Sequence, residues 1–223
     1  MLPTLHPRVK ICCIASIDEA KTAISLGASA VGLVSAMPSG PGVISEEKIA
    51  EIASQIPPPI ATFLLTSKQD APSIIAQQKR CRTNTLQLCD RVEKKVYQQI
   101  RDALPGVAIV QVIHVNGNES VQEAAVAAAF VDALLLDSGN SKLEVKELGG
   151  TGRVHNWSIS RAIRESVDKP IFLAGGLNGE NVARAISEVA PFGLDLCSGV
   201  RTNGRLDQVK LSRFFEAVRL SGQ

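Results

Sequence analysis

The feature that most constrains this chain is a regular alternation of short apolar runs with segments of helical periodicity. We count eight runs and eight helical segments, about one pair per 27 residues, without a composition break that would mark a domain boundary. The runs are continuously apolar, which is typical of parallel strands buried on both faces. We therefore predict an α/β chain folded as one (β/α)8 TIM barrel, a single domain over residues 1–223 with the barrel proper at about 8–220.

Helix-start signals support the division into elements. Ser16 followed by Glu19 forms a capping box before the first helical segment, and Gly27 ends that segment. Ser45 followed by two glutamates opens the second helix in the same way. The expected strands are 9–14, 30–34, 60–65, 85–88, 107–115, 131–136, 171–174 and 193–196, and the later helices 73–79, 92–103, 118–129, 157–167, 180–190 and 206–220.

Charge and cysteine usage exclude several classes of protein. The 24 basic and 22 acidic residues give a net charge of +2, too balanced for a nucleic-acid or membrane partner. The N-terminus lacks the apolar core of a signal peptide, and no apolar stretch reaches the ~18 residues of a membrane span. Five cysteines without a CxxC pair and three scattered histidines indicate a reduced, cytoplasmic protein without a zinc site.

Active sites of this fold lie at the C-terminal ends of the strands, where two reactive residues stand out. Cys12 lies near the end of the first strand; a small buried apolar residue is the plainer interpretation, and a catalytic thiol is the alternative. Asp137 directly follows the sixth apolar run. Burial there favours the protonated carboxyl that a general acid requires, and a helix-cap or turn aspartate fits the position equally well.

Glycine-bearing turns follow the last two strands. Gly175–Gly176 and Ser198–Gly199 offer backbone N–H groups that can approach a phosphate closely, at the position where barrels of this kind often bind one. Gly149 to Gly152 lie in the longest loop, which we expect to cover a site. The alternative is that these are ordinary turns and a plain connection.

Several motifs occur in a recognisable order along the whole chain, from about residue 8 to 220. They are VKIC (9–12), QL (87–88), LLLD (134–137), GGTG (149–152) with Trp157, LAGGLN (173–178) with Asn181–Val182, and DLCSGV (195–200). With these motifs in this order, the sequence resembles the phosphoribosylanthranilate isomerases of tryptophan biosynthesis.

The resemblance implies an Amadori rearrangement of N-(5-phosphoribosyl)anthranilate without a cofactor or metal. Cys12 would be the base and Asp137 the acid, and the expected partner is a phosphosugar substrate rather than a macromolecule, with the chain a monomer or homodimer. The substrate phosphate would be held by the turns after the last two strands, with the long loop closing over it. Its residues are Gly150, Thr151, Gly175, Gly176, Ser198 and Gly199.

The chain departs from the family pattern at the aglycone end of the site. Gly42 stands where the family carries the arginine that holds the anthranilate carboxylate, a pair that contributes roughly 1.5–3 kcal/mol. Arg82, Arg153 and Arg201 are candidate replacements. Cys13 also replaces a glycine, and Arg201 a glutamate. Two alternatives therefore stay open: a related isomerase acting on another phosphosugar amine, and a non-catalytic barrel that binds a phosphorylated metabolite.

Overall fold

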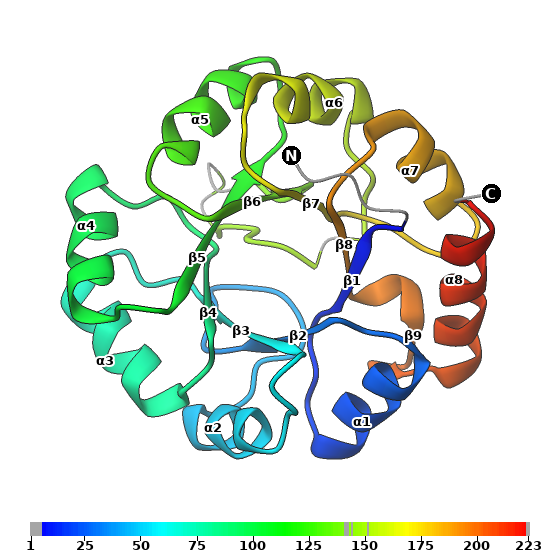
Figure 1. Ribbon diagram of the computed structural model, residues 1–223, viewed down its shortest axis with the longest axis horizontal. Coiled ribbons are helices and arrows are strands. Elements are labelled where there is room, and N and C mark those ends of the chain that lie inside the picture. Colours follow the sequence, from blue (N-terminus) through cyan, green and yellow to red (C-terminus); the bar gives the residue numbers. More distant parts are fainter. Residues whose placement is uncertain (1–5, 141–142, 144, 151, 222–223) are drawn as a thin grey trace.

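The computed structural model describes residues 6–140, 143, 145–150 and 152–221. Eight parallel strands form a closed barrel in sequence order, with the last strand paired to the first, and the helices form a ring around it (Figure 1). The predicted (β/α)8 barrel is confirmed. The strands are β1 (Arg8–Ile11), β2 (Ala30–Val34), β3 (Ala61–Thr66), β4 (Thr85–Leu88), β5 (Ala108–His114), β6 (Ala133–Asp137), β7 (Ile171–Leu173) and β8 (Gly193–Leu196).

The ring of helices follows the expected segments, with ends shifted by a few residues. Its members are α1 (Ile17–Leu26), α2 (Glu46–Ser54), α3 (Ala71–Cys81), α4 (Lys94–Ala103), α5 (Glu119–Ala128), α6 (Trp157–Ser166), α7 (Val182–Val189) and α8 (Gln208–Leu220). Helix α3, expected over 73–79, is two residues longer at each end. Asp70 caps this helix by accepting a hydrogen bond from the Ser73 backbone N–H, so the first turn starts earlier.

Alternation along the strands divides the apolar residues into two cores. One lies between the barrel and the helices and includes Val9, Ile11 and Phe214. The other fills the barrel interior and includes Phe63, Phe172 and Cys12. Because side chains i and i+2 of a strand share a face, residues 10 and 12 both point into the interior. The interior of the barrel therefore receives the residues that carry chemistry.

Two local features differ from the sequence prediction. The first strand ends at Ile11 rather than at Ile14, because Cys13 has φ +62°, which an extended strand does not accommodate. After β8 the chain forms a 3-10 turn, η1 (Ser198–Val200), and a small antiparallel hairpin, β9 (Arg201–Thr202) and β10 (Arg205–Leu206). This hairpin precedes α8 and was not predicted from the sequence.

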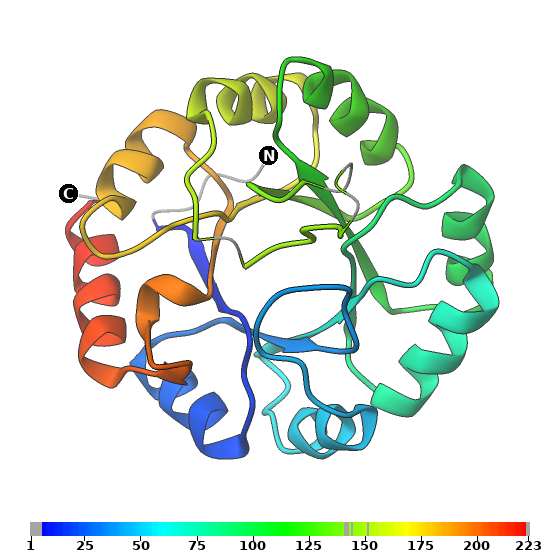
Figure 2. The ribbon, with the colours of Figure 1, turned by 180° about the vertical axis from the view of Figure 1, so that it is seen from behind.

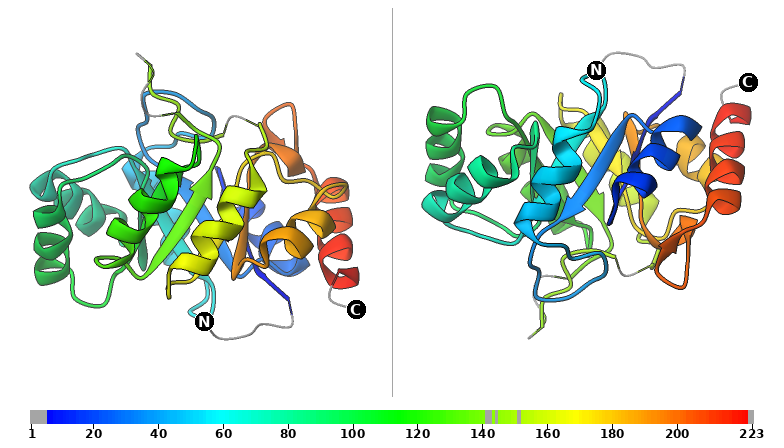
Figure 3. Two further views of the ribbon diagram at one scale, coloured as in Figure 1. Left: turned by 90° about the horizontal axis from the view of Figure 1, so that it is seen from above. Right: turned by 90° about the horizontal axis from the view of Figure 1, so that it is seen from below.

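Two long connections lie at one end of the barrel. Residues 35–45 between β2 and α2, and the described residues between β6 and α6 (138–140, 143, 145–150 and 152–156), cross the mouth of the barrel in Figure 2. Both connections project from the same end in Figure 3, beside the β9–β10 hairpin. This is the end at which the strands terminate. None of the described helices is long and apolar enough to cross a membrane.

Candidate active site

A pocket opens at the C-terminal end of the barrel, beneath the two long loops. Cys12, Asp137 and Asp195, from three different strand ends, line it together with glycines of three loops. The sequence-predicted acid and base therefore share one cavity. The remaining lining residues include Val34, Met37, Ser39, Gly40, Pro41, Leu65, Gln87, Cys89, Leu148, Gly149, Gly150, Gly152, Gly175, Gly176, Leu177, Cys197 and Ser198.

Cys12 and Lys10 face the same small space inside the barrel. A Cβ atom placed on Gly32 would lie 3.0 Å from the Cys12 Sγ and 3.1 Å from the Lys10 Nζ. Any larger residue at position 32 would therefore displace one of them. Gly32 leaves room for a thiol and an ammonium group to lie close together at the bottom of the pocket.

Lys10 is fully buried and forms an ion pair with Asp195, with 2.8 Å between Nζ and Oδ2. Burial alone would lower the pKa of Lys10, but the Asp195 carboxylate raises it above the ordinary lysine value. The ammonium group therefore stays protonated at neutral pH. It also lies 5.1 Å from the centre of the Phe63 ring, which provides a further favourable contact for the cation.

Asp137 ends β6 and is 7% exposed at the rim of the same pocket. One of its carboxylate oxygens, Oδ1, accepts a hydrogen bond of 2.8 Å from the Ser138 backbone N–H. The other faces the long loop: a Cβ on Gly149 would lie 2.9 Å from Asp137 Oδ2. The loop thus contacts the carboxyl group that the sequence singled out.

The two glycine turns after β7 and β8 lie against each other. A Cβ on Gly199 would come within 1.9 Å of the Leu177 carbonyl oxygen, so only glycine permits this contact. Gly175 and Gly176 have φ of +81° and +64°. In the part of the chain that the structure describes, their N–H groups donate no hydrogen bond to another protein group. These donors remain available to an anion.

The two long loops contact each other above the pocket. Ser39 donates a hydrogen bond of 2.6 Å from its hydroxyl to the Lys146 carbonyl oxygen. Pro41 packs against Gly150, where an added Cβ would lie 2.5 Å from the proline Cδ. Gly150 lies over the site as expected, whereas Thr151 lies outside the described residues. The loops together form a cover over Cys12 and Asp137.

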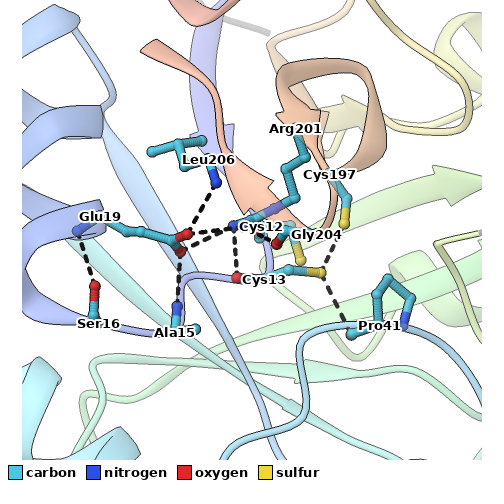
Figure 4. Close-up of polar contacts among 10 residues, drawn as sticks. All are labelled: Cys12, Cys13, Ala15, Ser16, Glu19, Pro41, Cys197, Arg201, Gly204 and Leu206. Atoms are coloured by element: carbon cyan, nitrogen blue, oxygen red, sulfur yellow. Dashed lines mark hydrogen bonds and ion pairs between the residues drawn. The ribbon is translucent and has the colours of Figure 1, made fainter.

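Arg201 organises the turn after β1 rather than the pocket (Figure 4). Its guanidinium donates to the carbonyl oxygens of Cys12 and Cys13, at 3.2 and 2.6 Å, and to both carboxylate oxygens of Glu19. Burial opposes ionisation of Glu19, but hydrogen bonds from Arg201 and from the backbone N–H groups of Leu206 and Ala15 hold its pKa below the usual range. One half of the predicted capping box is confirmed, because the Ser16 hydroxyl oxygen accepts a hydrogen bond from the Glu19 backbone N–H. The Glu19 carboxylate forms the ion pair with Arg201.

The Cys13 side chain packs directly against Gly42. A Cβ on Gly42 would lie 2.5 Å from the Cys13 Cβ and 2.9 Å from its Sγ, and Gly42 has φ +81°. The Cys13 side chain therefore occupies the space that a side chain at position 42 needs. The Cys13 Sγ also contacts the Pro41 carbonyl oxygen at 3.6 Å and the Cys197 Sγ at 2.8 Å.

The other two candidate arginines do not point to the site either. Arg82 caps the C-terminus of α3, just before β4 begins and hence at the opposite end of the barrel. Arg153 forms an ion pair with Glu147 on the exposed surface of the long loop. Arg201 holds Glu19 and the backbone. None of the three takes the place of the missing arginine in this structure.

The sequence was compared with models of known protein families. The model of N-(5'-phosphoribosyl)anthranilate isomerase matches residues 9–217. This chain belongs to that isomerase family. Curated members include a protein of Methanocella arvoryzae, 31% identical over 96% of this chain and 99% of its own length. An isomerase of Methanosarcina mazei is 34% identical over 95% of this chain and 94% of its length.

Solved isomerase structures agree with the fold. The enzyme from Thermotoga maritima superposes with a TM-score of 0.82 at 27% identity, covering 96% of this chain and 98% of that one. An isomerase in complex with reduced 1-(o-carboxyphenylamino)-1-deoxyribulose 5-phosphate superposes with a TM-score of 0.79 at 25% identity, with the same coverage. The family, and with it an isomerase barrel, is thereby established for this chain.

Sequence reasoning assigned no role to Lys10, Asp195 or Cys197, although all three lie inside the motifs VKIC and DLCSGV. The signal at Lys10 was a charged residue within an apolar strand, two positions before Cys12 and so on the same face. A buried lysine requires a partner, and the pairing of β1 with β8 places Lys10 opposite Asp195. Cys197 offered no comparable signal, because its neighbours in space come from other elements.

Proposed function

We propose that this isomerase carries out the Amadori rearrangement of N-(5'-phosphoribosyl)anthranilate to 1-(2-carboxyphenylamino)-1-deoxyribulose 5-phosphate in tryptophan biosynthesis. The observation that carries the proposal is the meeting of Cys12 and Asp137 in one pocket, beneath a cover of loops and beside two glycine turns. A base and an acid on different strand ends suit a reaction in which one proton is added and another removed.

The phosphate anchors the substrate in the proposed complex. The N–H groups of Gly175 and Gly176, with those of Ser198 and Gly199 beside them, supply fixed donors for the phosphate oxygens. Gly150 of the covering loop lines the same pocket and completes the cradle. Such anchoring places the ribose between the acid and the base, so that binding energy from the phosphate serves to orient the reacting carbons.

The first step opens the sugar ring. Protonated Asp137 donates its proton to the ring oxygen, the bond from C1′ to that oxygen breaks, and the nitrogen lone pair forms a C1′=N⁺ bond. The ring oxygen becomes a hydroxyl group. Burial of Asp137 at the rim excludes water that would compete for the developing charges.

The second step moves a proton at carbon. The Cys12 thiolate removes the proton from C2′, the electrons of that bond form C1′=C2′, and the C1′=N⁺ electrons return to nitrogen. The enol then loses its hydroxyl proton while C1′ gains one, which leaves the ketone. Asp137 has lost a proton and Cys12 has gained one, so the cycle closes with a net transfer from thiol to carboxylate. Lys10, protonated and facing the same space as Cys12, places a positive charge beside the sulfur that removes the proton.

One observation favours a second substrate, another phosphosugar amine without an anthranilate carboxylate. Gly42 leaves the aglycone end without the usual guanidinium, and Cys13 fills the space beside it. In this alternative the phosphate cradle and the two proton-transfer groups keep their roles, and only the aglycone changes.

A tryptophan auxotroph that lacks this isomerase tests the proposal. Expression of the wild-type chain should restore growth without tryptophan, and the purified protein should convert phosphoribosylanthranilate to its ketose product. Expression of the Cys12→Ala/Asp137→Ala double variant is the matched control and should not restore growth. A folded wild-type protein that neither complements nor turns over this substrate would point to the second substrate or to a non-catalytic barrel.

A further inference from the structure

Three thiols meet at the wall of the pocket, where β1 and β8 end side by side. The register of the two strands pairs Ile11 with Leu196, and the Cys12 backbone N–H donates to the Leu196 carbonyl oxygen at 2.7 Å. Cys13 and Cys197 follow directly. Their Sγ atoms are 2.8 Å apart, so little movement is needed for a covalent bond between them (Figure 4).

Cys197 is the more reactive of the two thiols. It is partly exposed in the pocket lining, whereas Cys12 and Cys13 are 6% and 5% exposed. The hydrogen bond with Cys13 lowers the pKa of Cys197, and the positive charge of Arg201 acts in the same direction although burial opposes it. Because the lowered pKa favours its thiolate form and its side chain is partly exposed, Cys197 is the sulfur that an oxidant attacks first.

Cys13 is placed to resolve an oxidised Cys197. Its φ of +62° and the hydrogen bond from Arg201 to its carbonyl oxygen fix the backbone, and its side chain points from the turn toward Cys197. Cys12, by contrast, faces Gly32 and Lys10 deeper in the barrel. A bridge between the adjacent residues Cys12 and Cys13 would distort the peptide between them, so Cys197 is the better partner of Cys13.

We propose that Cys13 and Cys197 form a reversible disulfide when hydrogen peroxide enters the pocket, and that this bridge leaves Cys12 as a free thiol. The Cys197 sulfur attacks one peroxide oxygen, the O–O bond breaks and one water leaves, which gives a sulfenic acid. The Cys13 sulfur then attacks the Cys197 sulfur, the S–O bond breaks and a second water leaves. One peroxide is reduced to two waters while two thiols are oxidised.

The test is to treat the full-length protein with hydrogen peroxide, alkylate the remaining thiols and map tryptic peptides by mass spectrometry. Peptide 11–21 carries Cys12 and Cys13, and peptide 185–201 carries Cys197. The expected product is these two peptides linked, with one alkylated cysteine, and separated again by dithiothreitol. Cys12→Ser should keep the link. Cys13→Ser should abolish it and let Cys197 proceed to the irreversible sulfinic acid.

Two further variants control for misfolding and for the loss of an unrelated thiol. Cys13→Gly tests the same loss in a residue that accepts the positive φ, should Cys13→Ser not fold. Cys81→Ser removes a buried thiol at the opposite end of the barrel and should keep the link. The proposal is overturned if the wild-type protein yields no linked pair, or if the link survives in Cys13→Gly and is lost in Cys12→Ser. Because the readout is mass, it does not depend on the proposed isomerase activity.

Discussion

At the scale of single residues, the ammonium group of Lys10 has the most consequence for chemistry. It is a permanent cation that faces the same space as the proposed base, and its charge is balanced by Asp195. Removing one member of such a buried pair typically costs about 3–5 kcal/mol, since the other charge is left unpaired. A test of its electrostatic role must therefore separate that cost from the effect on Cys12.

We predict that Lys10→Met lowers kcat at neutral pH by about tenfold or more, because the thiolate loses a nearby positive charge. The Lys10→Met/Asp195→Asn double variant removes the orphaned carboxylate and should fold more stably while remaining slow. The measurement is kcat at neutral pH beside the melting temperature: in the double variant the melting temperature should recover while kcat stays low. A wild-type kcat in the double variant would mean that Lys10 has a structural role only.

His155 gives a prediction for stability. Burial lowers its pKa to about 4, so the folded protein keeps this ring neutral through the range in which an unfolded histidine takes up a proton. The unfolded state therefore binds more protons between pH about 6.5 and about 4, and stability falls as the pH falls through that range, by up to about 3 kcal/mol. Urea unfolding should show this slope, and His155→Gln should reduce it. Equal slopes in both proteins would contradict the assignment.

At the scale of elements, the site depends on contacts between loops that are distant in sequence. The loop between β2 and α2 contacts the turn after β1 through the fit of Gly42 to Cys13. The same loop meets the long β6–α6 connection through Ser39 and Pro41. A substitution in one loop therefore has its effect in another, and position 42 cannot be changed alone.

We predict that Gly42→Arg destabilises the protein without improving binding, because its Cβ would overlap Cys13 and its φ of +81° disfavours a side chain. The double variant Cys13→Gly/Gly42→Arg removes the overlap, and its arginine can reach the aglycone. Its KM for phosphoribosylanthranilate should fall by about tenfold, the effect of one charge-assisted pair. Cys13→Gly alone is the control. A KM unchanged in the double variant, at unchanged melting temperature, would argue that another group binds the carboxylate.

At the scale of the whole molecule, the barrel was predictable because each strand and helix carries its own local signal. Runs such as residues 133–137 are buried on both faces, and caps such as Ser16 and Gly27 mark helix ends. The positions of Cys12 and Asp137 followed from the rule that sites lie at strand ends. These predictions needed no knowledge of which strands are neighbours.

The rest depended on packing between distant segments. The pairing of Lys10 with Asp195, 185 positions away, needs the closure of the barrel by β1 and β8. Arg201 was a candidate partner for a substrate carboxylate on sequence grounds. In the structure the hairpin after β8 places its guanidinium on Glu19 and on the backbone carbonyls of Cys12 and Cys13. Sequence patterns describe one element at a time, so they do not reveal a contact that only the assembled barrel creates.

The central claim is that Cys12 acts as the base of an isomerase. Its most direct test is the steady-state turnover of phosphoribosylanthranilate by Cys12→Ala beside the matched variant Cys13→Ala, with melting temperatures measured for both. We predict that kcat falls by about 10²–10⁴ in Cys12→Ala at a wild-type melting temperature, whereas Cys13→Ala changes mainly the melting temperature. A Cys12→Ala protein with wild-type kcat would contradict the assignment of the base and the mechanism built on it.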